Sequence, residues 1–499
     1  MFHETITEHT LRSINWSFSR DRGATVSLLC RYCVATMSLP WRCAVATLTV
    51  MTPTSAANPR DIVNYLTTTA ALPLIHTALG CAPARVDRGG HLRDLADSTV
   101  LTWRVEGVHH RPSGAVSVRF AVTLRCGEER LGVTTVASTE HLRPTPTTRT
   151  VRATAIDPNL LIHVWAMPHD PHLPGLAWAT DPTAVSTVVD APVLALTPVV
   201  YRPTRRAMIR ADSDEAGGVP GAWIKVLPPA QAQALGRTVC VAANSNFPVA
   251  SLIESPVPGV VIQRHVEGRT LAHVISRNPV AAARMGHHLV HTLDALPHEA
   301  TTWTRHPSWT DQRYHYATMV CDRFPDREPE IRHMMTIIDR LLRDDLPIVA
   351  THGDFFEGNI IVNDREDSPP RVSAVLDLDH VGPGVRADDY ACLLAHASVL
   401  PFLTPRQWVS VDPAEPWRSR LDQFLRGRRC PAYRESETVV EAWRLTCEQL
   451  TDPADLYARA ACVTLSLAAA TSLTDGDDEA RARLARALWW VDLALDYRS

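Results

Sequence analysis

Three short apolar segments near the middle of the chain have the pattern of a small antiparallel β-sheet. Residues 193–201 are apolar and rich in β-prone side chains, and residues 206–211 and 222–227 repeat this character. The polar stretch 212–221, which contains two consecutive glycines, separates the last two segments as a hairpin turn does. The pattern therefore predicts a sheet whose adjacent strands are also neighbours in sequence.

Helical periodicity dominates the C-terminal half, where apolar residues recur at the spacing of one helix face. A short apolar strand begins at Val260, and another covers residues 347–350. This combination of a sheet followed by many helices predicts an α+β fold. Helices are expected over residues 59–79, 230–243, 280–296, 328–343, 388–398, 417–426, 436–450, 453–474 and 478–497.

A short sequence motif is repeated in the two halves of the chain. Residues 111–119 and 202–210 both read R-P-[ST]-x-x-[AV]-x-[VI]-R, and the same offset places Thr134 opposite Lys225. We hypothesise that residues 95–140 form a second sheet that resembles the middle one but lacks its lysine. The alternative is that two unrelated hairpins have converged on the same turn chemistry.

Composition limits the class of protein. The 499 residues are enough for about three domain-sized units, and 45% hydrophobic with 21% charged residues is ordinary for a globular protein. A net charge of −4 gives no reason to expect nucleic-acid binding. The 11 cysteines are odd in number and irregularly spaced, which argues against a disulfide framework.

The first 57 residues are predicted to be a poorly ordered extension or an overlong start. Residues 26–50 are fairly apolar, but Arg31 and Arg42 interrupt them. A membrane-spanning helix needs about 20 nearly uncharged residues, and a secretory signal has its apolar core nearer the start. We therefore expect a cytoplasmic protein without a membrane partner, with a signal or anchor as the alternative.

The candidate chemistry lies in residues 352–359, which read H-G-D-F-F-E-G-N, and in Asp377 at the end of a following apolar run. This spacing is that of the catalytic loop and metal-binding strand of kinases. Phosphoryl transfer needs a carboxylate to orient the attacking hydroxyl, and an amide oxygen and second carboxylate to hold magnesium. Asp354, Asn359 and Asp377 have this chemistry. The alternative is a solvated acidic loop between two strands.

The sequences of these motifs resemble those of the aminoglycoside phosphotransferase superfamily of small-molecule kinases, which also includes choline, homoserine and maltose kinases. The resemblance rests on H-G-D at 352–354, L-D-L-D at 376–379, Gly384 and D-D-Y-A at 388–391. It covers roughly residues 190–499 and is strongest over 348–395. It implies a protein-kinase-like fold with two lobes, ATP and Mg²⁺ as cofactors, and a small-molecule hydroxyl as phosphate acceptor.

The resemblance also implies a division of the chain and an acceptor class. Residues 191–265 would form the nucleotide-binding lobe and residues 266–499 the helical catalytic and substrate-binding lobe. Outside the resemblance, the repeated R-P-[ST] motif suggests that residues 58–190 are an N-terminal cap module, with a degenerate repeat of the sheet lobe as one hypothesis for it. The acceptor would be an aminoglycoside-like antibiotic, an amino alcohol or a sugar; the motifs specify neither the acceptor nor an oligomeric state.

The resemblance assigns roles to individual residues. Asp354 would be the catalytic carboxylate, and Asn359 and Asp377 the metal ligands. Lys225, whose strand position points it away from its apolar neighbours, would contact the inner phosphates; an aggregation-limiting edge lysine is the alternative. Backbone groups from Gln263 to His265 would pair with adenine. His352 and Asp389 would brace the catalytic loop.

Two departures from the kinase pattern leave other functions open. The turn at 202–205 has no glycine with which to cradle phosphates, and the helix at 230–243 has no glutamate to pair with Lys225. Gln231 or Gln233, or a different partner, would have to serve that lysine. An active kinase is the favoured prediction; a pseudokinase that binds nucleotide without turnover and an interaction protein that acts through its N-terminal half are the alternatives.

Overall fold

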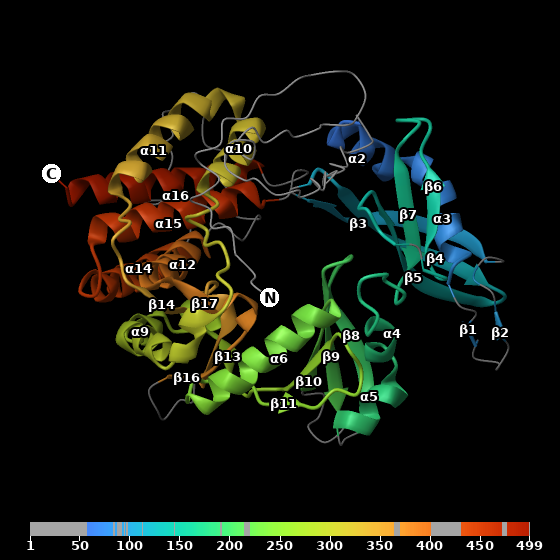
Figure 1. Ribbon diagram of the computed structural model, residues 1–499, viewed down its shortest axis with the longest axis horizontal. Helices are drawn as coiled ribbons and strands as arrows, with labels where there is room; N and C mark the ends of the chain where they lie inside the picture. The colour runs from blue at the N-terminus through green and yellow to red at the C-terminus, as the bar shows by residue number, and fades with distance from the viewer. Residues whose placement is uncertain are drawn as a thin grey trace, which may run out of the picture.

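The computed structural model describes residues 57–498, except 83–84, 87–91, 94, 96–97, 112, 144, 190–191, 214–219, 364–369, 401–430 and 472–476. It has three parts: an N-terminal module (57–166), a sheet lobe (193–264) and a helix-rich lobe (269–498) (Figure 1). The predicted N-terminal extension and the predicted helix over 417–426 lie outside the described residues, apart from Ala57.

The N-terminal module is an antiparallel sheet with two helices packed against it. The order of its strands is β3 (Thr99–His110), β4 (Val116–Cys126), β5 (Glu129–Ser138), β7 (Leu161–Ala166) and β6 (Arg149–Arg152). A small hairpin, β1 (Arg85–Val86) and β2 (Leu92–Arg93), precedes them. The predicted helix over 59–79 is two helices, α2 (Pro59–Thr67) and α3 (Leu72–Leu79), joined by a 3-10 turn.

The sheet lobe contains the predicted meander. β8 (Val193–Arg202), β9 (Arg206–Ser213) and β10 (Pro220–Val226) pair in sequence order, and β12 (Val260–Arg264) and β11 (Leu252–Ile253) complete the antiparallel sheet. Helix α6 (Pro229–Asn244) follows β10. Short helices α4 (Leu176–Ala179) and α5 (Pro182–Val189) connect the module to β8, and their apolar residues share a core with this sheet.

The two five-stranded sheets have the same connectivity. The order β3-β4-β5-β7-β6 matches β8-β9-β10-β12-β11 strand for strand, and every pairing in both is antiparallel. One difference is that α6 lies between β10 and β11, whereas the described residues between β5 and β6 form no helix. The hypothesised repeat thus has a matching strand order, and common origin stays a hypothesis.

The helix-rich lobe follows β12 and carries two small sheets. One sheet joins β13 (Arg269–Thr270), β15 (Ile360–Asn363) and β16 (Arg371–Val375), and the other joins β14 (Ile348–Thr351) and β17 (Gly382–Val385). The helices are α7 (Leu271–Arg277), α8 (Pro279–Ala283), α9 (Gly286–Asp294), α10 (Arg313–Arg323), α11 (Glu328–Leu341), α12 (Arg386–Val399), α14 (Pro431–Glu448), α15 (Pro453–Ala469) and α16 (Asp477–Asp496). The predicted helix over 280–296 is therefore divided into α8 and α9.

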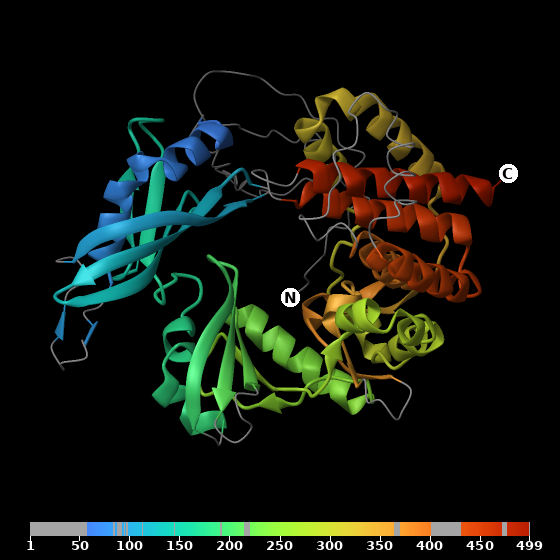
Figure 2. The same cartoon turned by 180° about the vertical axis from the view of Figure 1, so that it is seen from behind.

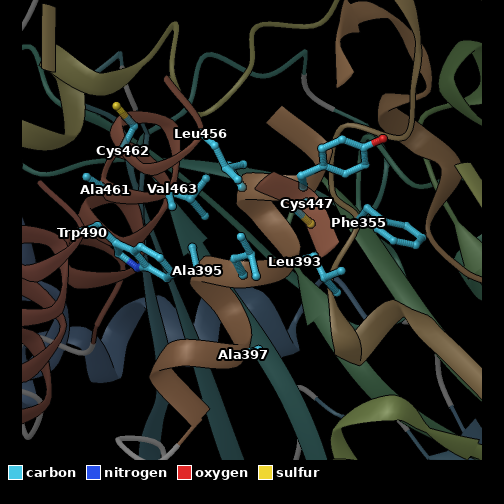
Figure 3. Packing of buried hydrophobic residues seen from close by; sticks show 14 of the residues in the cluster. Phe355, Leu393, Ala395, Ala397, Cys447, Leu456, Ala461, Cys462, Val463 and Trp490 are labelled. Carbon is cyan, nitrogen blue, oxygen red and sulfur yellow. The ribbon is translucent and has the colours of Figure 1, made fainter. Parts of the chain in front are cut away.

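The core of this lobe forms where α12, α15 and α16 meet. Leu393 of α12, Leu456 and Val463 of α15 and Trp490 of α16 lie in one buried cluster (Figure 3). Burial of such side chains stabilises the fold by about 1.5–3 kcal/mol each relative to exposure. In the described ranges, no helix is both long and apolar enough to cross a bilayer.

The predicted fold class is confirmed by this arrangement. A small antiparallel sheet lobe precedes a lobe in which helices predominate, and the chain is α+β as expected. The predicted catalytic motif lies between β14 and β15, on the side of the helix-rich lobe that contacts the sheet lobe through Lys225. The fold thus places the motif opposite the strand lysine.

Candidate active site

The loop that carries Asp354 is held by a buried carboxylate from α12. Asp389 is fully buried, and its two oxygens accept the backbone N–H groups of His352 at 2.9 Å and Gly353 at 2.8 Å. Gly353 has φ +79°, and a Cβ there would lie 2.9 Å from the carbonyl oxygen of His380. The loop therefore depends on a glycine at this position and on Asp389 beneath it.

Replacing Asp389 with alanine should destabilise the protein by about 3–5 kcal/mol, because two buried N–H groups lose a charged acceptor. The measurement is the free energy of unfolding from chemical denaturation. The matched control is Asp322→Ala, which removes an exposed aspartate from α10 and should change stability little. A loss below about 1 kcal/mol in the Asp389 variant would contradict this role.

His352 braces the same loop from inside. Burial lowers its pKa to about 4, so the ring is neutral at pH 7. Its Nε2 donates to the carbonyl oxygen of Leu376 at 3.1 Å, and its Nδ1 accepts the N–H of Asp354 at 3.3 Å. One imidazole thus ties the catalytic loop to the strand end that precedes Asp377.

The end of β16 brings Asp377 beside Asn359. The N–H of Leu376 donates to the carbonyl oxygen of Asn359 at 2.7 Å. Asp377 then adopts the left-handed conformation, with φ 63° and ψ 54°. A non-glycine residue there costs on the order of 1 kcal/mol and persists where surrounding contacts enforce it. The strained position turns the carboxylate of Asp377 towards β10.

Lys225 of β10 is the cation that faces this carboxylate. Its side chain is only 5% exposed, and its Nζ donates to Asp377 Oδ1 and, at 2.5 Å, to Asp379 Oδ2. Burial acts to raise the pKa of Asp377, but Lys225 and then Arg206, whose Nη1 lies 3.3 Å from Oδ2, outweigh it. The pKa of Asp377 is therefore well below its usual value, whereas burial raises that of Asp379.

Asp354 has a different environment. The amide nitrogen of Asn359 lies 3.0 Å from its carbonyl oxygen and 3.4 Å from its Oδ2, and the thiol of Cys392 lies 3.9 Å from Oδ1. Burial, and secondarily the negative charge of Asp377, raise the pKa of Asp354 to about 7. A carboxylate with a pKa near neutrality is suited to accept a proton from a hydroxyl.

The residues around Asp377 suit a divalent cation with oxygen ligands. Asp377 supplies a carboxylate, and Asn359 donates through its side-chain nitrogen to Asp354, which leaves its amide oxygen for a ligand role. Hard cations such as Mg²⁺ prefer such oxygens. The cationic groups of Lys225 and Arg206 occupy the same carboxylate, which shows that positive charge is accepted there.

The structure brings together four of the six predicted site residues: Lys225, Asp354, Asn359 and Asp377. Gln263 and His265 lie in and just after β12. Gln263 is paired on both sides, with Trp223 and Leu252, and the N–H of His265 donates to the carbonyl oxygen of Gly221 at 3.2 Å. Their role towards adenine stays a prediction.

Two contacts in the site were not predicted from the sequence. Asp379 is the second carboxylate on Lys225, and Arg206 is the second cation on Asp377. The repeated aspartate in L-D-L-D was the signal for the first, since alternate residues after a strand can reach the same ligand. The missing helix glutamate is thereby explained, because Lys225 has its carboxylates in the L-D-L-D segment.

Comparisons with known proteins agree with these motifs. Residues 220–436 match the model that describes the phosphotransferase enzyme family. Comparison with curated protein sequences gave no match. Among solved structures, the chain is similar to a Plasmodium vivax ethanolamine kinase (14% identity, TM-score 0.34), with 59% of this chain and 81% of that chain covered.

Two further solved structures are a choline/ethanolamine kinase family protein from Mesorhizobium loti (14% identity, TM-score 0.38) and the aminoglycoside phosphotransferase APH(3'')-Id from Streptomyces rimosus (19% identity, TM-score 0.32). The first similarity covers 64% of this chain and 96% of that chain, and the second covers 53% and 98%. Such remote similarity does not specify a substrate. The predicted resemblance is nevertheless confirmed by the family match, which covers residues 220–436.

Proposed function

We propose that the protein is an ATP-dependent phosphotransferase that moves the γ-phosphate of ATP to a hydroxyl group of a small molecule. The observation that carries this proposal is the convergence of Asp354, Asn359 and Asp377 opposite the amine of Lys225. Phosphoryl transfer depends mainly on positioning and on neutralising phosphate charge, and these four side chains supply both.

Each residue has a distinct task. Asp377 and Asn359 would hold Mg²⁺, and Lys225 would contact the inner phosphates of the nucleotide. Asp354 orients the acceptor hydroxyl and takes its proton. Bound Mg²⁺ supplies charge neutralisation at the phosphates. The protein is expected to be cytoplasmic. Its phosphate acceptor is expected to be an aminoglycoside-like antibiotic, an amino alcohol or a sugar.

A pseudokinase is the second candidate, and one observation favours it. Lys225 is engaged by two carboxylates, and both contacts must be broken or rearranged before the amine can serve a phosphate. The glycine-free turn between β8 and β9 points the same way. Such a protein would bind nucleotide and transfer nothing.

The test uses the full-length chain with ATP, Mg²⁺ and a panel of candidate alcohols: aminoglycosides, amino alcohols and sugars. ATP consumption is followed together with the mass of each alcohol, and EDTA serves as the metal-free control. Under the proposal, one class gains a single phosphate only with Mg²⁺. Mg·ATP binding without ATP consumption, with or without an acceptor, would favour the pseudokinase, and absence of Mg·ATP binding would reject both candidates.

The proposed base predicts a pH dependence. Because the pKa of Asp354 is raised to about 7, the carboxylate is protonated below that pH and cannot accept a proton. Under limiting substrate, kcat/KM should therefore fall about tenfold per pH unit below roughly pH 7 and reach a plateau above it. The measurement is kcat/KM from pH 5 to 8.5, and a flat profile between pH 5 and 7 would contradict the role of Asp354 as base.

A further inference from the structure

The turn between β8 and β9, residues 202–206, lies at the end of its hairpin that is nearest the N-terminal module (Figures 1 and 2). It carries Arg202, Arg205 and Arg206 and contains no glycine. In the kinase pattern the corresponding hairpin covers the phosphates, and its backbone amides usually need glycine for close approach. The chain therefore has to stabilise phosphate charge at this turn by another route.

The middle of the turn is fixed by groups that precede the sheet lobe in sequence. Thr204 is 2% exposed and has φ 64°, an unfavourable conformation for a β-branched residue. Its N–H donates to Asp170 Oδ2 at 2.8 Å. Arg111 donates to the carbonyl oxygen of Pro203 at 2.7 Å and to Thr204 Oγ1 at 3.0 Å. These contacts hold a conformation that the turn would not prefer alone.

The start of the turn is fixed by the same region. The buried hydroxyl of Tyr201 donates to Asp170 Oδ2 at 2.8 Å and accepts the indole N–H of Trp165 at 3.0 Å. Arg119 of β4 donates to the carbonyl oxygen of Tyr201. A buried polar group that loses its hydrogen-bond partner costs about 1–3 kcal/mol of stability. The network therefore favours the one backbone geometry in which all of these hydrogen bonds are made. Asp170 thus connects both Tyr201 and Thr204 to the N-terminal half.

Arg206 is the residue that this fixed turn presents to the site. Its Nη1 lies 3.3 Å from Asp377 Oδ2, and its side chain remains 32% exposed. Lys225 contacts the other oxygen of the same carboxylate. Two cations therefore converge on the residue proposed to hold the nucleotide's metal, and the planar guanidinium suits bidentate contact with phosphate oxygens.

We propose that Arg206 binds the phosphates of ATP in place of a glycine-rich loop, and that Asp170 and Arg111 are positioning residues that hold the β8–β9 turn for it. The inference rests on the proposed function, since it takes ATP as the ligand. It gives the N-terminal half a role in nucleotide binding that acts through the position of the β8–β9 turn.

The first test is Arg206→Gln in the full-length chain, with Arg125→Gln as the matched control. Arg125 is exposed on β4, at the far end of that strand from the turn. Calorimetric titration with Mg·ATP should show at least about tenfold weaker binding for Arg206→Gln and wild-type affinity for Arg125→Gln. Adenosine, which lacks phosphates, should bind both variants equally. Unchanged Mg·ATP affinity in Arg206→Gln would overturn the phosphate role.

The second test asks whether Asp170 acts through Arg206. Asp170→Asn replaces one acceptor oxygen by an amide, and should raise the KM for ATP about three- to tenfold. In a double-mutant cycle, Asp170→Asn should add little to the loss already caused by Arg206→Gln. A general loss of structure would instead lower affinity by the same factor in both backgrounds, and that result would overturn the positioning role.

Arg111→Gln is the second positioning variant, for use if Asp170→Asn does not fold. It removes the contacts to Pro203 and Thr204 and should give the same non-additive pattern. Additive losses here would equally overturn the proposal. If the wild-type chain binds no Mg·ATP, the proposed function fails; if it binds Mg·ATP and the Arg206 variant binds as tightly, only this inference fails.

Discussion

Replacing Asp354 with asparagine is expected to lower kcat for phosphoryl transfer at least about a hundredfold while Mg·ATP still binds. The amide has nearly the same shape and can still contact Asn359, but it cannot take the proton of the attacking hydroxyl. The carboxylate of Asp377 and the amine of Lys225 are untouched, so the nucleotide site persists. The measurements are kcat by product formation and the dissociation constant of Mg·ATP by calorimetry.

The matched control for this variant is Asp322→Asn, because Asp322 is an exposed aspartate on α10. It should turn over at the wild-type rate. Turnover retained in Asp354→Asn would remove this residue from its proposed place as base. Loss of Mg·ATP binding together with turnover would indicate that Asp354 serves the metal instead.

The second large effect is expected for Asp377→Asn, which should weaken Mg·ATP binding at least about tenfold through loss of a charged metal ligand. Asparagine tolerates the left-handed conformation of residue 377, so the backbone is kept. Lys225 retains its contact with Asp379 at 2.5 Å and does not become an unpaired buried cation. The variant should therefore fold, and its defect should concern the metal.

Calorimetry with and without Mg²⁺ distinguishes a metal defect from a general one. Wild-type protein should lose affinity for ATP when EDTA removes the metal, whereas Asp377→Asn should respond much less. Asp379→Asn is the informative comparison, because it removes the other carboxylate on Lys225. Equal loss of the Mg²⁺ response in both variants would contradict the assignment of Asp377 and Asn359 as the metal pair.

The sequence predicted the sheet meander and the common loop of Asp354 and Asn359 from local signals, whereas the approach of Lys225 to Asp377, 152 positions away, was implied only by the family resemblance. The apolar, β-prone segments form β8, β9 and β10, and the stretch from Asp354 to Asn359 lies in the loop before β15. Helix ends were less predictable. The periodicity over 59–79 continues through Pro73, where proline interrupts the helical hydrogen bonds and α3 begins. The predicted helix over 280–296 is likewise divided, and α9 begins at Gly286. A Cβ at this position would lie 2.7 Å from Thr446 Oγ1, so the close contact depends on glycine.

What the sequence could not show depends on contacts between distant segments. The L-D-L-D repeat pointed to Asp379, but the contact of Asp379 with Lys225 and that of Asp170 with Thr204 have no local signature, since the paired residues are separated by many positions. The repeated R-P-[ST] motif was the only sequence indication that the two sheets have the same strand order. Strand order depends on which strands pair and is not a property of any one segment.

The ion pairs of Lys225 have a consequence for the order in which ligands arrive. Carboxylates already neutralised by an ammonium and a guanidinium have little attraction for a bare divalent ion. Asp377 would therefore bind Mg·ATP in preference to free Mg²⁺, because the phosphates would offer Lys225 and Arg206 an alternative partner. In the resting protein, the site would stay closed to adventitious ions.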